Sequence, residues 1–428
     1  MLNRPQFVLG VSCVAAVSMW LYVLCVLIPH QKHEALTSQT PRGNLSDLYP
    51  RWLGARELLL RRRDPYSAEI TREIQIGYYG RELDSARPHD PKDQQAFAYP
   101  VYVVLMLAPT VGMDFRTVHR IFFPLLALLT AASILLWLDA LGYRISSWGA
   151  VTWMVFTLGC FPAVQGLKLE QLSLLAAALI AAALDALTRR RFVLAGVLLA
   201  LATIKPQLVC LLMLWLLLWI VGRWRDRRRL FWSFVAGIVL LVLAGEVLLP
   251  GWIGEFRTAM SAYYRYTGGG RSVLDVLLTP VWGRLAAGIL VSLLLIDLWR
   301  LRQAGEGTDQ FRWSMCLTLA TTVLVIPMFA PYNQLLLLPG LMMTVRSGRR
   351  LWQDNRWSRL FVVTTALTVF WPFLAAFGLV VGLLFLPGTR VRGAWGLPFY
   401  SSFAIPVTIY ATLRAGRTTL VAPNREPL

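Results

Sequence analysis

Long apolar runs separated by short polar connections dominate this chain of 428 residues. A transmembrane α-helix needs about 20 apolar residues to cross the hydrocarbon core of a bilayer. The sequence therefore predicts an all-α polytopic membrane protein with about 11 to 14 transmembrane helices. We expect a single integral membrane domain over residues 1–428, with candidate spans at residues 7–29, 119–141, 147–166, 171–188, 192–204, 207–222, 231–250, 277–298, 313–329, 332–345, 359–387 and 397–413.

The composition supports this class of protein. Hydrophobic residues make up 57% of the chain and charged residues 15%, whereas about a quarter of the residues in soluble proteins are charged. The net charge of +19 would suggest a nucleic-acid partner for a soluble domain. Here the arginines lie in short clusters between apolar runs, as they do in cytoplasmic loops of membrane proteins. We therefore expect contact with membrane lipids and no nucleic-acid partner.

Four basic clusters orient the predicted helices, because Lys and Arg are enriched in cytoplasmic loops. They occupy every second connection, at residues 189–191, 223–229, 300–312 and 346–359. The N-terminus is then cytoplasmic, provided that the short run 98–112 enters the protein without crossing the membrane. The run 7–29 is longer than the core of a secretory signal and is read as a retained helix. The connections predicted to be extracytoplasmic are 166–171, 204–207, 251–276 and 329–333.

Residues 30–97 form a long polar stretch, which we predict to be the first extracytoplasmic loop. Within it, residues 46–63 carry apolar side chains at three- and four-residue spacing, which predicts an amphipathic helix. We expect this helix at the membrane surface, with its arginines reaching lipid phosphates. Asp47 stands at the start of the helix, where it is either an N-cap or a carboxylate that accepts a proton during catalysis. The two roles are compatible.

Metal ligands are not apparent in the sequence. Three of the four histidines, His30, His33 and His89, lie in the polar loop, but their spacing matches no ligand pattern. The five cysteines lie in apolar runs without the paired spacing of a metal site. We expect surface histidines, no metal site and no cofactor.

An ordered series of short motifs resembles glycosyltransferase family 87, most clearly over residues 45–210. No single motif is specific, and their joint order and spacing carry the resemblance. The chain departs from the family pattern at Val101, where a second proline is frequent, and at Glu170, where glycine is frequent. The matching pieces are Asp47-Leu48-Tyr49, Ala55-Arg56-Glu57-Leu58-Leu59, Asp64-Pro65-Tyr66, Phe97-Ala98-Tyr99-Pro100, Ala108-Pro109, Glu170-Gln171-Leu172-Ser173-Leu174-Leu175, Ala195-Gly196, Ile204-Lys205-Pro206 and Ala330-Pro331-Tyr332-Asn333.

The resemblance implies a GT-C-type membrane enzyme that uses a polyprenyl-phosphate sugar, typically of mannose, on the extracytoplasmic side. The transfer would be inverting and metal-independent, with Asp47 as the general base. The acceptor would be a hydroxyl of a glycolipid, a glycan or a protein, and a bacterial inner membrane would be the expected location.

A departing lipid phosphate needs cations, because negative charge grows on it in the transition state. Lys205-Pro206 divides the apolar run 192–222, and a lysine in such a run is costly unless it meets an anion or water. Lys205 is therefore the first candidate phosphate ligand, and a lysine that snorkels at a helix end is the alternative. Arg271 and Arg284 are further candidates on the same side.

Seven other residues are predicted to line the substrate site or to be ordinary interfacial residues: Tyr66, Tyr99, Gln171, Glu246, Tyr332, Asn333 and Gln334. Two other function classes remain open. A transporter or flippase for a lipid-linked sugar would usually show two related halves with paired broken helices, and an envelope scaffold would need no catalytic residue. The chain has no second copy of the region 45–100, which favours an enzyme.

Overall fold

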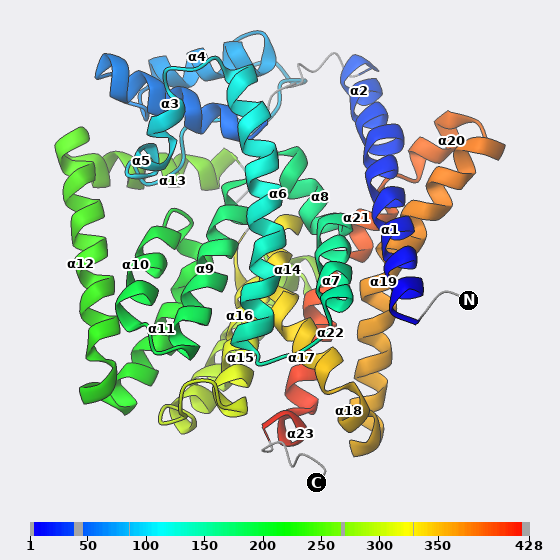
Figure 1. Cartoon of the computed structure of the whole chain (residues 1–428). Coiled ribbons are helices and arrows are strands. Elements are labelled where there is room, and N and C mark those ends of the chain that lie inside the picture. The colour runs from blue at the N-terminus through cyan, green and yellow to red at the C-terminus, as the bar shows by residue number, and fades with distance from the viewer. Residues whose placement is uncertain (1–3, 38–45, 85, 267–269, 328, 422–428) are drawn as a thin grey trace.

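Every regular element in the computed structural model is a helix, over the residues that the structure describes: 4–37, 46–84, 86–266, 270–327 and 329–421. This confirms the predicted all-α class. The axes of most helices are roughly aligned, with neighbouring helices running up or down the bundle. A layer of helices lies across their upper end in Figure 1. That layer contains α3 (Leu48–Arg61), α4 (Ala68–Tyr79) and α13 (Trp252–Tyr266).

Five described helices are long and apolar enough to cross a membrane. A sixth span is added if the pair α7 (Ser147–Gly159) and α8 (Phe161–Lys168), bent by 59°, counts as one. The five are Pro5–Thr37, which joins α1 (Arg4–Tyr22), η1 (Val23–Leu27) and α2 (Ile28–Thr37), together with α6 (Phe115–Ala140), α12 (Trp224–Leu248), α15 (Pro280–Arg300) and α19 (Arg356–Phe385).

The other predicted spans are shorter helices. The 11 residues of α10 (Phe192–Ala202) cover about 16 Å at 1.5 Å per residue, against a hydrocarbon core of about 30 Å. Several of the 11 to 14 predicted transmembrane helices are therefore too short to cross the whole hydrocarbon core. These are α9 (Leu172–Thr188), α11 (Pro206–Gly222), α16 (Asp309–Val325), η3 (Pro331–Leu337) with α17 (Leu338–Arg346), and α22 (Ala404–Ala415). Short connecting helices are α14 (Val273–Leu278), α18 (Gly348–Asp354), α20 (Gly388–Gly393), α21 (Gly396–Ser401) and α23 (Arg417–Val421).

Two of the predicted apolar runs belong to long continuous helices. The first helix continues past Pro29 to Thr37, after a π-helical turn in which the Ile28 N–H donates to Val23 O, so residues 30–37 of the predicted loop are helical. Pro372 does not divide the run 359–387, because α19 passes through it as one helix; neighbouring groups compensate for a proline in a membrane helix. Residues 38–45 and 85 of the predicted loop lie outside the described residues.

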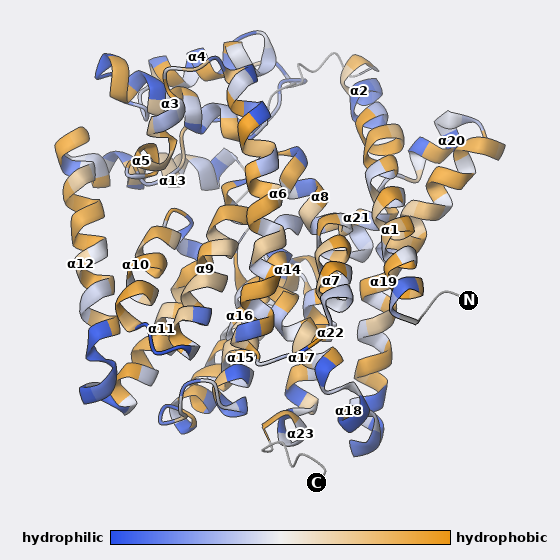
Figure 2. Ribbon diagram, in the orientation of Figure 1, coloured by the Kyte–Doolittle hydropathy of each residue, from blue (hydrophilic) through white to orange (hydrophobic). Residues whose placement is uncertain are grey.

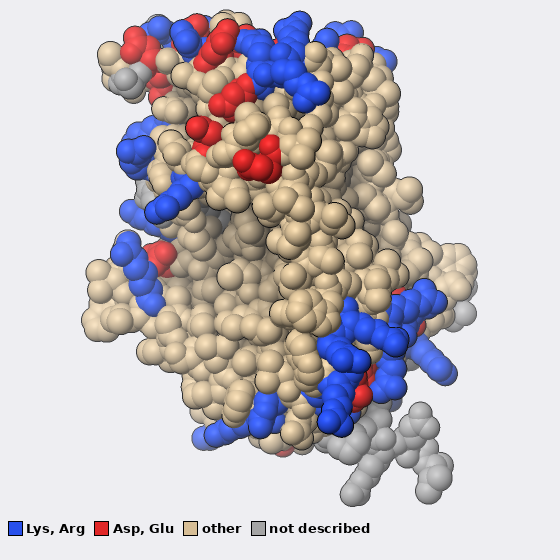
Figure 3. All heavy atoms as spheres, turned by 90° about the vertical axis from the view of Figure 1, so that its left-hand side faces the viewer, with Lys and Arg blue, Asp and Glu red and all other residues tan. Residues whose placement is uncertain are grey.

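The four basic clusters share one end of the helix bundle, as the predicted alternation requires. Arg190 and Arg227 both pair with Glu306, and Arg346 pairs with Asp309. These residues come from all four clusters. Figure 2 shows hydrophilic residues gathered at the lower ends of α12, α15 and α18, and Figure 3 shows Asp and Glu concentrated near the top of its face. The four basic clusters therefore lie together at the lower end of the bundle in Figure 1.

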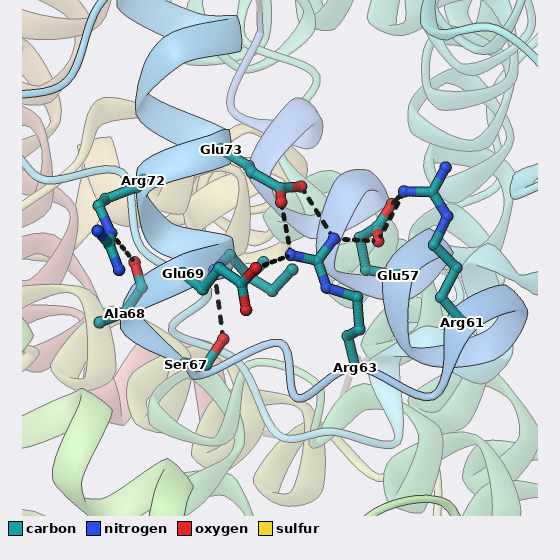
Figure 4. A network of polar contacts seen from close by, with 9 residues as sticks. Glu57, Arg61, Arg63, Ser67, Ala68, Glu69, Arg72 and Glu73 are labelled. Carbon is teal, nitrogen blue, oxygen red and sulfur yellow. Dashed lines mark hydrogen bonds and ion pairs between the residues drawn. The ribbon is translucent and has the colours of Figure 1, made fainter.

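The predicted amphipathic helix is confirmed as α3, and ion pairs join it to α4 (Figure 4). The buried Glu57 carboxylate accepts from Arg61 at 3.1 Å and from Arg63 at 2.8 Å. Arg63 also pairs with Glu69 at 2.9 Å and with Glu73 at 2.5 Å. Arg61 and Arg63 thus make contacts within the protein, whereas the sequence assigned the arginines of this segment to lipid.

The short run 98–112 lies beneath α3 and holds only α5 (Val103–Leu107) and the single turn η2 (Ala108–Thr110). Val101, Val103 and Leu107 are fully buried. Five helical residues rise only about 8 Å, which agrees with the prediction that this run does not cross as one helix. Buried in protein, such a segment needs no lipid-facing hydrogen bonds.

Candidate active site

A cavity of about 100 Å³ lies at the end of the bundle opposite the basic clusters. Its walls come from the start of α3, the segment 93–100, the residue before α9, the α10–α11 junction, α13 and η3. All four connections that the charge pattern placed on the extracytoplasmic side contribute residues: Gln171, Lys205, Tyr263 and Tyr332. The cavity is therefore assembled from segments far apart in the sequence.

Asp47 occupies the N-cap position of α3 but does not act as a capping residue. Its backbone is helical (φ −64°, ψ −9°) and its side chain makes no capping bond. The carboxylate instead lines the cavity, where Gln171 Nε2 donates a hydrogen bond to Asp47 Oδ2. The Asp47 N–H donates to Leu169 O at 3.0 Å. The geometry thus contradicts the predicted capping role, and the catalytic role of the carboxylate stays a prediction.

Lys205 lies at the break between α10 and α11, as predicted from Lys205-Pro206. Its side chain is buried and lines the cavity, where Lys205 Nζ donates to Gln171 Oε1 at 3.2 Å. The ammonium also lies 5.1 Å from the ring centroid of Tyr99 and 5.6 Å from that of Tyr332. These contacts exclude a lysine that snorkels outward. Gln171 thus links the carboxylate of Asp47 to the ammonium of Lys205.

Arg51 is a second cation in the cavity, although the sequence predicts that the arginines of residues 46–63 reach lipid phosphates. It lies one helical turn after Asp47, and Arg51 Nη1 donates to Asp47 O at 2.8 Å. Its guanidinium carbon is 4.9 Å from the Tyr99 ring centroid. Arg51 Nε is buried and has no hydrogen-bond partner among the described residues. The spacing of four residues from Asp47 was the available signal, because it puts both residues on one helix face.

The charges around Asp47 act on its pKa in both directions. Burial is the largest effect and raises the pKa of Asp47 above its usual value, and the Asp93 carboxylate raises it further. Arg51, Lys205 and the hydrogen bond from Gln171 lower the pKa of Asp47. Burial prevails, so this carboxylate holds a proton more readily than an exposed aspartate does.

Tyr99 is part of the cavity wall, whereas Tyr66 supports it from behind. Tyr66 OH donates to Tyr99 O at 2.6 Å, and its ring packs edge-on against Phe97. The Asp64 carboxylate accepts from the Tyr66 N–H at 2.9 Å. The Asp-Pro-Tyr motif therefore holds the wall in place. Tyr66 itself does not line the cavity.

The structure does not bring the other predicted residues into this cavity. Arg271 and Arg284 have exposed side chains and do not line it. Glu246 Oε1 accepts from the Gly251 N–H at 2.7 Å and so stabilises the turn between α12 and α13. Asn333 and Gln334 are buried on η3. Gln334 donates to a backbone carbonyl at 3.1 Å and lines a separate apolar pocket.

A buried carboxylate on the turn before α9 holds Asp47 in position. Glu170 is fully buried and adopts a left-handed backbone (φ 48°). Ser46 Oγ donates to Glu170 Oε2, and His119 Nδ1 lies 2.9 Å from Glu170 Oε1. Burial raises the pKa of Glu170. In the sequence, Glu170 stands out only as a departure from the family pattern.

The described residues contain no group of three or more His, Cys, Asp or Glu side chains that could hold a metal ion. The charged groups at the cavity are the carboxylates of Asp47 and Asp93 and the cations of Arg51 and Lys205. Such a set can bind an anion, donate to and accept from hydroxyl groups, and take up a proton.

The model of glycosyltransferase family 87 matches residues 97–331, which is more than half of the chain, so the chain belongs to this family. It is therefore a membrane glycosyltransferase. The match includes Tyr99, Gln171 and Lys205, whereas Asp47 and Arg51 precede it. No curated protein and no solved structure matches the chain.

Proposed function

We propose that this member of family 87 transfers a sugar, with mannose as the first expectation, from a polyprenyl-phosphate donor to an acceptor hydroxyl. Asp47 is the general base, and the configuration at the anomeric carbon is inverted. One observation carries the proposal. A carboxylate with a raised pKa and a buried ammonium share one cavity and are joined through Gln171.

The proposed reaction is a single displacement. The acceptor oxygen forms a bond to the anomeric carbon while its proton passes to Asp47. The bond between the anomeric carbon and the phosphate oxygen breaks, and polyprenyl phosphate leaves with the bonding electrons. Lys205 and Arg51 lie where they can stabilise that charge, on the same cavity and within about 5 Å of the Tyr99 ring. Protein cations fill this role in the proposed metal-independent mechanism.

The setting of the site fits a lipid-linked donor. The cavity lies at the end of membrane-length helices and is opposite the basic clusters, which by the positive-inside tendency would be cytoplasmic. We therefore propose an extracytoplasmic site, a cytoplasmic N-terminus, a GT-C-type arrangement and a location in a bacterial inner membrane. The proposed acceptor is a hydroxyl of a glycolipid, a glycan or a protein.

The test is transfer from radiolabelled polyprenyl-phospho-mannose to an acceptor pool of lipid extract by the purified protein. Asp47→Asn should lower kcat by about 10² to 10⁴, the usual contribution of a general base. Lys205→Ala should lower kcat by about 10² to 10³, as the loss of one transition-state donor does. Asp84→Asn, at an exposed acid of the same loop, should leave transfer unchanged. Wild-type transfer by Asp47→Asn would overturn the assignment of the base.

A further inference from the structure

A second carboxylate, Asp93, lines the cavity and has no role in the reaction described above. Its two oxygens are held by one neighbour: the Gln95 N–H donates to Oδ1 at 3.0 Å, and Gln95 Nε2 donates to Oδ2 at 2.9 Å. Each oxygen keeps a further lone pair for another donor. Asp93 is therefore an oriented acceptor, whereas a free surface acid would move between rotamers.

The segment around Asp93 is fixed from behind by α4. Tyr79 OH donates to Asp93 O at 2.8 Å, and Gln75 Nε2 donates to Gln94 O at 3.2 Å. Gln95 is buried and has a left-handed backbone (φ 54°). A residue other than glycine keeps this conformation only where its surroundings enforce it, and such residues cluster at binding sites.

Tyr266, at the end of α13, supplies a polar group to the same cavity. Its hydroxyl is buried and has no hydrogen-bond partner among the described residues. Burial first, and then the Asp93 carboxylate, raise the pKa of Tyr266, so the phenol stays protonated and can donate. Leaving a buried hydroxyl without a partner is unfavourable, and a hydrogen bond to a ligand hydroxyl would remove that penalty.

We propose that Asp93, Gln95 and Tyr266 form the subsite for the sugar ring of the donor, and that this ring is uncharged. The inference rests on the proposed function. An oriented carboxylate suits two hydroxyls of a sugar, and a tyrosine offers both a ring face and a hydroxyl. A uronic acid would place its carboxylate near Asp47 and Asp93, and like charges in one buried site are strongly disfavoured.

The position of the cations indicates that the ring belongs to the donor. The cavity measures about 100 Å³ and is small beside the pockets of about 300–1,000 Å³ that hold drug-sized ligands, so its lining residues lie close together. Lys205 and Arg51 line the same cavity as Asp93. A phosphate held by these cations therefore brings its own sugar next to Asp93.

The experiment compares two lipids that differ only in the sugar. Equilibrium dissociation constants of the detergent-purified full chain are measured for polyprenyl phosphate and for polyprenyl-phospho-mannose, by quenching of intrinsic tryptophan fluorescence. The ratio of the two constants reports the contribution of the sugar. We expect the sugar to tighten wild-type binding about tenfold, which is 1.4 kcal/mol.

Asp93→Asn and Tyr266→Phe should each reduce this ratio several-fold, while both still bind polyprenyl phosphate at least as tightly as wild type. Asp84→Asn is the matched control and should keep the wild-type ratio. Unchanged ratios in Asp93→Asn and Tyr266→Phe would overturn the sugar subsite. Tighter binding of polyprenyl-phospho-glucuronic acid than of the mannose lipid would also overturn the uncharged sugar. If wild type binds none of these lipids, the proposed donor class fails instead.

Discussion

Replacing Gln171 with leucine should shift the pH dependence of transfer to higher pH. Gln171 Nε2 donates to Asp47 Oδ2, and a donor to a carboxylate favours its ionised form. Burial already raises the pKa of Asp47, and this hydrogen bond is one of the opposing effects. Without the donor, the pKa of Asp47 rises further.

The size of the effect follows from the strength of the bond. A hydrogen bond to a charged group contributes about 1.5–3 kcal/mol, and 1.4 kcal/mol is a factor of ten in an equilibrium constant. Because a water molecule would replace part of the bond, we take about tenfold as the expected change in the ratio of ionised to protonated Asp47. A base acts only when ionised, so activity falls as the pH drops through the pKa of Asp47. On that acidic limb, the variant should lose about tenfold more kcat/KM than on the plateau at higher pH.

The assay is kcat/KM as a function of pH for wild type and Gln171→Leu, with polyprenyl-phospho-mannose as the donor. The variant also loses the 3.2 Å contact to Lys205, which lowers activity at every pH, so only the pH-dependent part reports on Asp47. Gln94→Leu is the matched control, because this exposed side chain lies outside the cavity. Parallel profiles for wild type and Gln171→Leu would refute the reasoning.

Three further changes test contacts that support the site and the basic end of the bundle. Ser46→Ala removes the hydroxyl that donates to a buried carboxylate beside Asp47, so steady-state kinetics should show kcat several-fold lower at nearly constant donor KM; unchanged kcat would mean that this bond does not position the base. Gly54→Ala would place a Cβ 2.5 Å from the Phe97 ring, and overpacking of about 1–3 kcal/mol should lower the thermal midpoint in detergent; an unchanged midpoint would show that the ring moves freely. Arg227→Met removes a fully buried guanidinium and should lower the free energy of unfolding by about 3–5 kcal/mol. Thermal unfolding in detergent should therefore show a larger fall in midpoint for Arg227→Met than for Gly54→Ala, and an equal or smaller fall would contradict this order.

The sequence predicted the parts of the structure that depend on hydrophobicity and backbone chemistry. Apolar runs gave the helices, and alternation of basic clusters correctly separated the two ends of the bundle. Lys205-Pro206 marked a real break, because proline has no N–H and clashes with a preceding turn. These signals are local, so no tertiary contact is needed to detect them.

What the sequence could not predict depends on the rotation of each helix and the direction of each side chain. Arg51 and Arg61 lie on the same amphipathic helix, yet Arg51 enters the cavity and Arg61 pairs with Glu57. Arg271 was proposed as a phosphate ligand from topology alone, but it is exposed and does not line the cavity. Glu170 acquires its role only when Ser46, 124 residues away in the chain, folds against it.

The short helices on either side of Lys205 fix the depth of the proposed reaction. α10 has 11 residues and α11 has 17, so Lys205 stands at most about 16–26 Å above the basic ends of these helices. That height is less than the roughly 30 Å of the hydrocarbon core. The phosphate of a lipid-linked donor would therefore meet Lys205 at or below the level of the lipid headgroups, while the polyprenyl chain stays among the acyl chains of the bilayer. The acceptor, in contrast, would have to approach from the aqueous side, under the layer that α3, α4 and α13 form above the bundle.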